Sequence, residues 1–190
     1  MTDRRAERTR EALRKAFIEL VSERGYDATT IQLLADRANV ARTTFYLHYQ
    51  SKQELFMDCH DNIVCRLPRT SISQTLLSGS PPPGMVAAFE HLAAAGDLIR
   101  AILRSKEGAL IVRMLHDWKR RTIEAQLQAA LAEESAVPVD LLANYLAGAH
   151  MGLTREWLEK RVKATPVQMA RTLHRLHRAA IDDSLPSRQS

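Results

Sequence analysis

The chain contains only two cysteines, Cys59 and Cys65, among its 190 residues. They are six positions apart on one predicted helix, which points them to different faces, so we expect reduced thiols and no disulfide. No run of about 18 apolar residues is present, so no ordinary membrane-spanning helix is expected. The N-terminus is charged and unlike a secretory signal. These absences predict a cytoplasmic protein that makes no contact with a membrane.

The motifs of common enzyme sites are also absent from the sequence. There is no glycine-rich phosphate loop, no serine in a nucleophile elbow and no HExxH. His174 and His177 are three positions apart on a predicted helix and could share a metal ion. No Cys, Asp or Glu nearby completes a ligand set, so a solvated basic face is the better interpretation. We therefore expect no enzyme activity, no metal and no cofactor.

Strand-forming residues are scarce in long runs, whereas Ala, Leu, Arg, Glu and Gln are abundant. This composition predicts an all-α protein. The 45% of hydrophobic residues is enough for a folded core. The formal net charge of +5 favours a polyanionic partner. Net charge alone is weak evidence, however, because affinity for DNA depends on the few basic groups that reach phosphates.

The stretch from Thr29 to Phe56 has the pattern of a helix-turn-helix. A short break at Asn39 and Val40 separates a first amphipathic helix from a second, brief one. Two short helices in close succession suit DNA recognition, with the second in the major groove and the first across the phosphate backbone. The apolar repeat of the first helix consists of Ile31, Leu34, Ala35 and Ala38.

At these residues the sequence resembles the DNA-binding domain of the tetracycline-repressor (TetR) family of bacterial transcriptional regulators. The resemblance runs from about Thr9 to Phe56. It implies a homeodomain-like three-helix DNA-binding domain over residues 1–51. A C-terminal helical bundle for dimerisation and ligand binding would follow over residues 52–185, with a disordered tail at 186–190. The matching residues are Thr30-Ile31, Leu34-Ala35, Ala38-Asn39-Val40, Thr44-Phe45-Tyr46, His48-Tyr49 and Ser51-Lys52-Gln53-Glu54-Leu55-Phe56.

Three positions depart from the family pattern. Asn39 stands where the family usually has glycine, but Asn tolerates the left-handed conformation that a tight turn can require. Ala41 stands where serine is usual, so the normal cap of the second helix and one phosphate contact are expected to be missing. Thr43 replaces a small residue. None of the three is expected to break the fold.

We expect most DNA contacts from the second helix of the motif. Arg42, Thr43 and Thr44 are the candidates for base contact, and Arg42 is best suited to guanine. The resemblance assigns Tyr46, His48, Tyr49 and Lys52 to the DNA backbone, although Tyr49 fits a core or hinge aromatic better. Thr29 or Thr30 should cap the first helix, with Gln32 closing a capping box, and offer a hydroxyl to a phosphate. The predicted DNA-binding set is Thr29, Thr30, Arg42, Thr43, Thr44, Tyr46, His48, Tyr49 and Lys52.

The C-terminal part begins with a run from Thr70 to Gly84 that we predict to be a mobile loop, because three successive prolines cannot continue a helix. Five helices should follow, at about 85–103, 106–114, up to 134, 138–162 and 166–183. Stripes of Met and aromatic residues usually form ordinary core, but in a regulator they also favour a ligand pocket. The predicted ligand-binding residues are Met85, Phe89, Leu103, Met114, His116, Trp118, Tyr145 and His150.

The last two predicted helices favour a dimer. Asn144, Gly148 and Gly152 recur every four residues and form a smooth strip that lets another helix come close, either within the chain or from a second copy. Two such helices per chain resemble the four-helix dimer interface of the TetR family. The predicted interface consists of Gly148, Gly152, Leu153, Trp157, Leu173 and Leu176.

The sequence thus predicts a homodimeric, sequence-specific transcriptional regulator. In this interpretation it is a repressor that an unknown small-molecule effector releases from a palindromic double-stranded DNA operator. One alternative is a DNA-binding protein that senses no ligand or works through a protein partner, and a helical enzyme with an unrecognised site is another. A core without polar groups would favour the ligand-independent protein. A cavity with convergent polar groups such as His116, Tyr145 or His150 would favour an effector.

Overall fold

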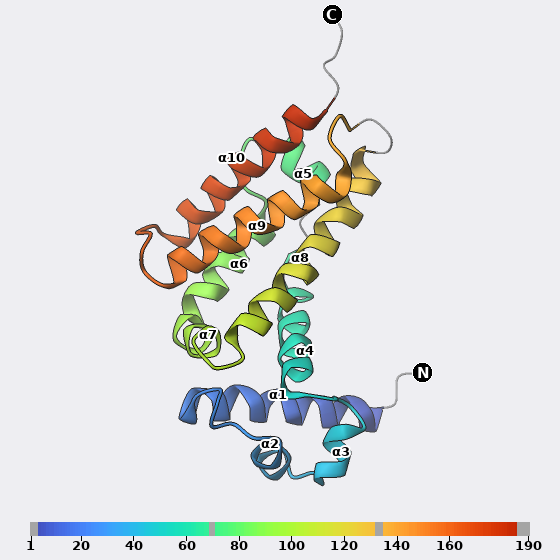
Figure 1. Cartoon of the computed structure of the whole chain (residues 1–190), viewed down its shortest axis with the longest axis vertical. Coiled ribbons are helices and arrows are strands. Elements are labelled where there is room, and N and C mark those ends of the chain that lie inside the picture. The colour runs from blue at the N-terminus through green and yellow to red at the C-terminus, as the bar shows by residue number, and fades with distance from the viewer. Residues whose placement is uncertain (1–3, 69–70, 132–134, 186–190) are drawn as a thin grey trace, which may run out of the picture. The chain divides into compact units, whose positions relative to one another are not determined.

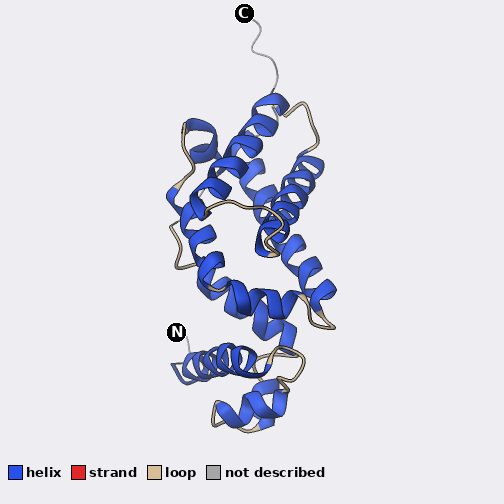
Figure 2. Ribbon diagram, turned by 90° about the vertical axis from the view of Figure 1, so that its left-hand side faces the viewer, coloured by secondary structure: helices blue, strands red, loops and turns tan. Residues whose placement is uncertain are grey.

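The computed structural model describes residues 4–68, 71–131 and 135–185. Ten helices and no strand occur in these residues (Figures 1 and 2). The predicted all-α fold is therefore confirmed. Within the described ranges, no helix is both long and apolar enough to cross a membrane.

The chain divides into two compact units. One contains the described residues up to 66 together with 97–112, and the other contains 67–96 and the residues from 113 onward. This division differs from the predicted boundary after residue 51, because the helix that begins at Lys52 packs on the first helix of the chain. The predicted tail at 186–190 lies outside the described residues.

The first unit is built on α1 (Arg4–Arg24), which buries one apolar face against α2 (Ile31–Arg37) and α4 (Lys52–Val64). Gly25 ends α1 with a φ of +80°, a left-handed conformation that glycine adopts at low cost. The helix-turn-helix consists of α2 and α3 (Arg42–Tyr46). Asn39 in the turn between them has a φ of 53°, as its tolerance of left-handed backbone predicts.

A later segment completes the first unit. It comprises most of α7 (Gly96–Leu103) and the first residues of α8 (Gly108–Leu131). The turn between these helices requires glycine, because a Cβ at Gly108 would lie 2.1 Å from the carbonyl oxygen of Leu103. Next to this turn the backbone N–H of Lys106 donates to both carboxylate oxygens of Asp27, at 3.2 and 3.3 Å. The segment is thus tied to the loop between α1 and α2.

The second unit packs α10 (Pro166–Ser184) against α5 (Ile72–Leu77), α6 (Pro83–Ala94) and α9 (Val139–Leu158). It has two apolar clusters. The first contains Ile72, Ile123, Leu127, Leu142, Ala143, Leu146, Ala147 and Ile181. The second is formed by Phe89, Met169, Ala170 and Leu173.

Several predicted helix boundaries in the second half of the chain were wrong. The predicted mobile loop at 70–84 contains α5, because Ser71 and Gln74 form a capping box around its first turn. The predicted helix at 85–103 is broken into α6 and α7 near Gly96, whereas the two predicted helices after 106 form the single helix α8. The capping box predicted for Thr165 and Gln168 is present at the start of α10.

Candidate nucleic-acid interface

The buried ring of Phe45 orients α3. Phe45 is 0% exposed, and its ring meets those of Tyr46 and Tyr49 at centroid distances of 5.6 and 5.7 Å. The N-cap residue Ala41 makes no side-chain hydrogen bond, as its identity predicts. The first N–H groups of α3 therefore have no side-chain cap at Ala41, and the opposite face of the helix points to solvent.

Arg42 and Thr43 lie on this solvent face, as predicted for base-contacting residues. The Arg42 guanidinium carbon lies 5.8 Å from the centre of the Tyr46 ring, and Nη2 donates to the Tyr46 hydroxyl at 3.4 Å. Stacking on Tyr46 holds the guanidinium over α3 while its remaining N–H groups face solvent. Thr44 is half-buried.

The sequence analysis missed Leu47. Its side chain is 81% exposed, directly after the last residue of α3. An exposed leucine of this kind can contact the methyl group of thymine in the major groove. The available signal was the helical period, because position 47 lies on the same face as Thr43 and opposite the buried Phe45. Its apolar character instead suggested core.

Only one of the two threonines before α2 is exposed enough to contact DNA. Thr30 is exposed and caps α2, since its hydroxyl oxygen accepts from the Leu33 N–H at 3.2 Å. Thr29 is 1% exposed and its hydroxyl donates to the Gly25 carbonyl at 2.9 Å. Thr29 therefore does not fit its predicted role as a DNA contact. The predicted capping box does not form, because Gln32 donates to Asp36 instead.

Tyr49 is a core residue and is likewise removed from the set. It is 4% exposed, and its hydroxyl donates to Asp58 at 2.6 Å. Burial, reinforced by the Asp58 carboxylate, raises the pKa of Tyr49. Arg14 donates to the same carboxylate at 2.9 Å, so the three side chains join α1, α4 and the end of the helix-turn-helix. His48 is half-buried beside the Tyr49 ring, at a centroid distance of 6.4 Å.

We call α1, α2 and α3 together the reading head of the protein. Lys52 supports this reading head from inside. Its ammonium donates to the backbone carbonyls of Tyr26 and Thr29, at 2.8 and 3.1 Å, and lies 3.9 Å from the centre of the Tyr26 ring. Burial lowers the pKa of Lys52, and the nearby carboxylates of Glu107 and Asp27 partly offset this effect. In the structure the side chain is thus engaged with the α1–α2 loop, whereas the resemblance assigned it to the DNA backbone.

Comparison with known proteins covers both parts of the chain. Residues 13–59 match the family model described as bacterial regulatory proteins, tetR family, and residues 79–178 match a model described as transcriptional regulator C-terminal region. The chain belongs to the TetR family. The helix-turn-helix of α2 and α3 lies within the region that matches the tetR-family model.

Named relatives of this TetR-family chain include bacterial regulators. The uncharacterized HTH-type transcriptional regulator YxbF of Bacillus subtilis (strain 168) is 48% identical over 54 residues, which cover 28% of this chain and 14% of that protein. The HTH-type transcriptional regulator TcmR of Streptomyces glaucescens is 26% identical over 160 residues, covering 74% of this chain and 66% of TcmR. The chain thus spans less than two thirds of the length of these curated relatives.

Solved structures share the TetR fold at low sequence identity. The dihydroxyacetone kinase operon activator DhaS has a TM-score of 0.63 and 14% identity, with 94% of this chain and 98% of that chain covered. A TetR transcriptional regulator from Streptococcus agalactiae 2603V has a TM-score of 0.55 and 24% identity, with 92% and 96% covered. At these identities the likeness concerns the fold alone.

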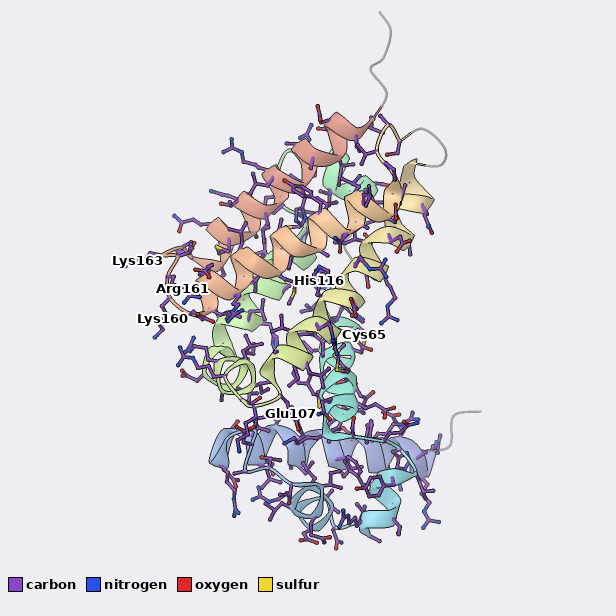
Figure 3. All side chains as sticks on the ribbon, in the orientation of Figure 1. Cys65, Glu107, His116, Lys160, Arg161 and Lys163 are labelled. Atoms are coloured by element: carbon purple, nitrogen blue, oxygen red, sulfur yellow. The ribbon has the colours of Figure 1, made fainter. Side chains whose placement is uncertain are left out.

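The structure does not bring all the predicted ligand-binding residues of this TetR-family protein together. Phe89 and His150 stack in the second unit, with ring centroids 5.9 Å apart, and Met85 packs on the same cluster. Leu103 belongs to the first unit. Tyr145 is 62% exposed, so it faces outward and is not a pocket residue. The remaining members, Met114, His116 and Trp118, are half-buried on α8 (His116 is labelled in Figure 3).

Two surface hollows of the described residues lie away from the predicted ligand-binding residues. One is an open groove between α1 and α4, and the other lies beside Gln74 and Pro82. Neither is lined by a predicted ligand-binding residue.

The predicted dimer residues of the TetR-family chain divide into two groups. Gly148, Gly152 and Leu176 are exposed. A Cβ on Gly152 would meet nothing within 4 Å, and one on Gly148 would meet only the His116 Nε2 atom, at 4.0 Å. The other three residues point inward, because Leu173 is 0% exposed, Leu153 packs on the Phe89 cluster, and the Trp157 Nε1–H donates to the Ala164 carbonyl at 2.8 Å.

The histidines of α10 were predicted to lie on a solvated basic face, and that prediction is wrong. His174 and His177 are 2% and 8% exposed. The His174 Nε2 atom lies 3.1 Å from the carbonyl oxygen of Thr75, so α5 covers this face of α10. Sequence periodicity indicated which residues share the face, but it contained no information about which helix packs on it.

Proposed function

We propose that this TetR-family regulator is a dimeric repressor that leaves a palindromic operator when a small molecule binds its second unit. The observation that carries the DNA-binding part is the outward face of α3. Arg42, Thr43, Tyr46 and Leu47 all point to solvent around the fully buried Phe45. An exposed arginine at the start of a short helix suits bidentate recognition of guanine in the major groove.

The test is a binding selection from random duplexes, followed by gel shifts of the selected operator with Arg42→Ala. We expect a loss of about 1–3 kcal/mol in binding free energy and a relaxed preference at one base pair. Arg121→Ala on α8 is the matched control, because Arg121 is exposed and lies in the second unit. If Arg42→Ala keeps wild-type affinity and base preference, α3 does not read the operator as proposed.

The dimer is supported by an exposed apolar strip on the last two helices. Leu141 and Tyr145 are 59% and 62% exposed on α9, in line with Gly148 and Gly152, and Leu176 on α10 is 51% exposed. A second copy would bury these side chains through a two-fold interface.

Gly152→Arg should produce monomers in light scattering and lower operator affinity, because a monomer recognises only half of a palindrome. Ala125→Arg on the exposed face of α8 is the control, and a dimeric Gly152→Arg protein would refute the strip as the interface.

A ligand-independent DNA-binding protein is the second candidate function. It is favoured by the close packing around Phe89, which is 1% exposed, and by the lack of predicted ligand residues in the two surface hollows beside α1 and beside Gln74. A thermal-shift screen of metabolites separates the two. An effector must stabilise the free protein and weaken operator binding by the same factor by which DNA weakens effector binding, typically about 5–150-fold.

The direction of regulation needs its own experiment. Among the structures that share the fold, DhaS is named an operon activator and NalD a secondary repressor of an efflux pump. The fold therefore accommodates both activities. A reporter gene placed behind the selected operator distinguishes them, because a repressor lowers expression in the absence of effector whereas an activator raises it.

A further inference from the structure

Three basic side chains converge in the second unit from three different helices. They are Lys119 on α8, His150 on α9 and His177 on α10. The two imidazole rings are 5.8 Å apart between centroids. The Lys119 charge lies close enough to lower the pKa of both histidines, after burial as the main cause. These residues are distant in sequence, so no local spacing pattern predicts the cluster.

Among the described residues, no acidic side chain forms an ion pair with this cluster. Lys119 makes no ion pair within the described ranges, and its only charged or aromatic contact there is with the ring of Trp118, at 5.8 Å. Burial, with no opposing carboxylate, lowers the pKa of the Lys119 amine to about 8. Lys119 is half-buried, and a partly desolvated cation without a counterion weakens the folded state. Such a residue points to an anion that is supplied from outside the chain.

Two buried polar atoms lie unsatisfied in the same unit. The His177 Nε2 atom has no hydrogen-bond partner although the residue is only 8% exposed. The Thr154 hydroxyl is also buried without a partner, one helical turn after His150 on α9. Buried polar atoms in proteins nearly always have partners, and those that lack one call for an explanation. A ligand with a polar group beside His177 would give its Nε2 atom a partner.

The other side of the cluster is apolar and adaptable. The Phe89 ring stacks on His150 at 5.9 Å and meets Trp157 edge-on at 5.5 Å. Met85 and Met169 belong to the same cluster, and methionine side chains repack readily around a ligand. A ligand must displace Phe89 from the His150 ring, because Phe89 closes this region in the free protein.

We propose that this cluster binds an organic anion with one carboxylate and an apolar body. The carboxylate would accept a hydrogen bond from the Lys119 ammonium and a second one from His177 Nε2, which takes up a proton when the anion binds. The body would replace Phe89 among Met169 and Trp157. A cation is disfavoured because three basic groups surround the site. Inorganic phosphate is disfavoured because its strong hydration is not recovered against aromatic walls. The site deepens the effector part of the proposed function and depends on that function only for its effect on DNA binding.

A purely structural role of Lys119 makes the opposite prediction for the free protein. If the lysine holds the fold together, Lys119→Met lowers the melting temperature. If it is kept for a ligand, Lys119→Met removes an unpaired, half-buried charge and leaves the melting temperature of the ligand-free protein unchanged or raises it. Lys163→Met is the matched control, because Lys163 is exposed in the loop between α9 and α10 (Figure 3).

The binding experiment uses full-length protein and calorimetric titration. The probes are straight-chain acids from butyrate to dodecanoate, 3-phenylpropionate, the corresponding neutral amides, and inorganic phosphate. We expect at least one acid to bind, its amide and phosphate to bind far more weakly, and Lys119→Met to lose about tenfold or more in affinity for the acid. Lys163→Met should retain wild-type affinity.

Several results would overturn the site: no acid binding, equal binding of acid and amide, stronger binding of phosphate, or unchanged affinity of Lys119→Met. Its failure is separable from that of the proposed function. Acids that bind through Lys119 without changing operator affinity leave the site in place and refute effector control. A wild-type protein that selects no operator refutes the DNA-binding function whatever the acids do.

Discussion

The basic side chains that support the helix-turn-helix in the first unit differ from those of the Lys119 cluster in the second unit in the partners that they have. In the first unit each of the cations that support the reading head has partners: Arg14 binds Glu7 and Asp58, and Lys52 donates to two backbone carbonyls. In the second unit Lys119 and the imidazoles beside it have no acidic partner within the described residues. A recognition surface benefits from a rigid support, whereas a binding site must keep groups unsatisfied until its ligand arrives.

The largest effect should come from the core of the reading head. Phe45→Ala removes a fully buried ring and should lower the free energy of unfolding of the first unit by about 3–5 kcal/mol. Leu47→Ala changes a side chain that is 81% exposed and should shift it by no more than about 0.5 kcal/mol. Urea denaturation followed by circular dichroism measures both. Equal losses for the two variants would mean that α3 is not oriented by Phe45.

A pH titration of stability tests whether the second unit holds the His177 ring neutral. Burial and Lys119 lower the pKa of His177 from 6.5 to about 4, so between these values the unfolded chain binds more protons than the folded one. The free energy of unfolding should therefore fall by about 1.4 kcal/mol per pH unit as the pH decreases through this window. His177→Gln should flatten this part of the profile. An unchanged slope in the variant would show that the ring is not held neutral by its surroundings.

The two half-buried lysines, Lys52 and Lys119, offer a direct comparison. Lys52→Met leaves the carbonyls of Tyr26 and Thr29 without their donor and should lower the free energy of unfolding by about 1–3 kcal/mol. The same substitution at Lys119 should be neutral or stabilising. Thermal melts of both variants in the same buffer decide the matter. Destabilisation by both substitutions would show that Lys119, like Lys52, stabilises the fold.

The smallest expected effect concerns Tyr49. Tyr49→Phe removes the hydrogen bond to Asp58 and should lower the free energy of unfolding by about 0.5–1.5 kcal/mol. Because the hydroxyl points into the head, operator affinity at a temperature where the variant is folded should remain unchanged. A gel shift beside Tyr46→Phe, whose hydroxyl is on the exposed face, provides the comparison. A marked loss of affinity for Tyr49→Phe alone would return this residue to the DNA contacts.

The sequence predicted the first unit more accurately than the second. The helix-turn-helix, the left-handed turn at Asn39 and the missing cap at Ala41 depend on residues that are close in the chain, and local physics determines them. Contacts over longer separations were not predictable. Lys52 reaches carbonyls 26 and 23 positions earlier, and Thr29 and Tyr49 turned out to be buried by such packing.

The sequence by itself determined that the protein is all-helical and TetR-like, with Arg42 and Thr43 on the outward face of the recognition helix. Helical periodicity is sufficient for this, because it decides which residues share a face. Only the tertiary structure decided what covers each face. It placed His174 and His177 under neighbouring helices, turned Tyr145 outward and brought Lys119 to two imidazoles with no acidic partner among the described residues. Burial and charge pairing depend on neighbours that are remote in the chain, and no spacing rule within one helix encodes them.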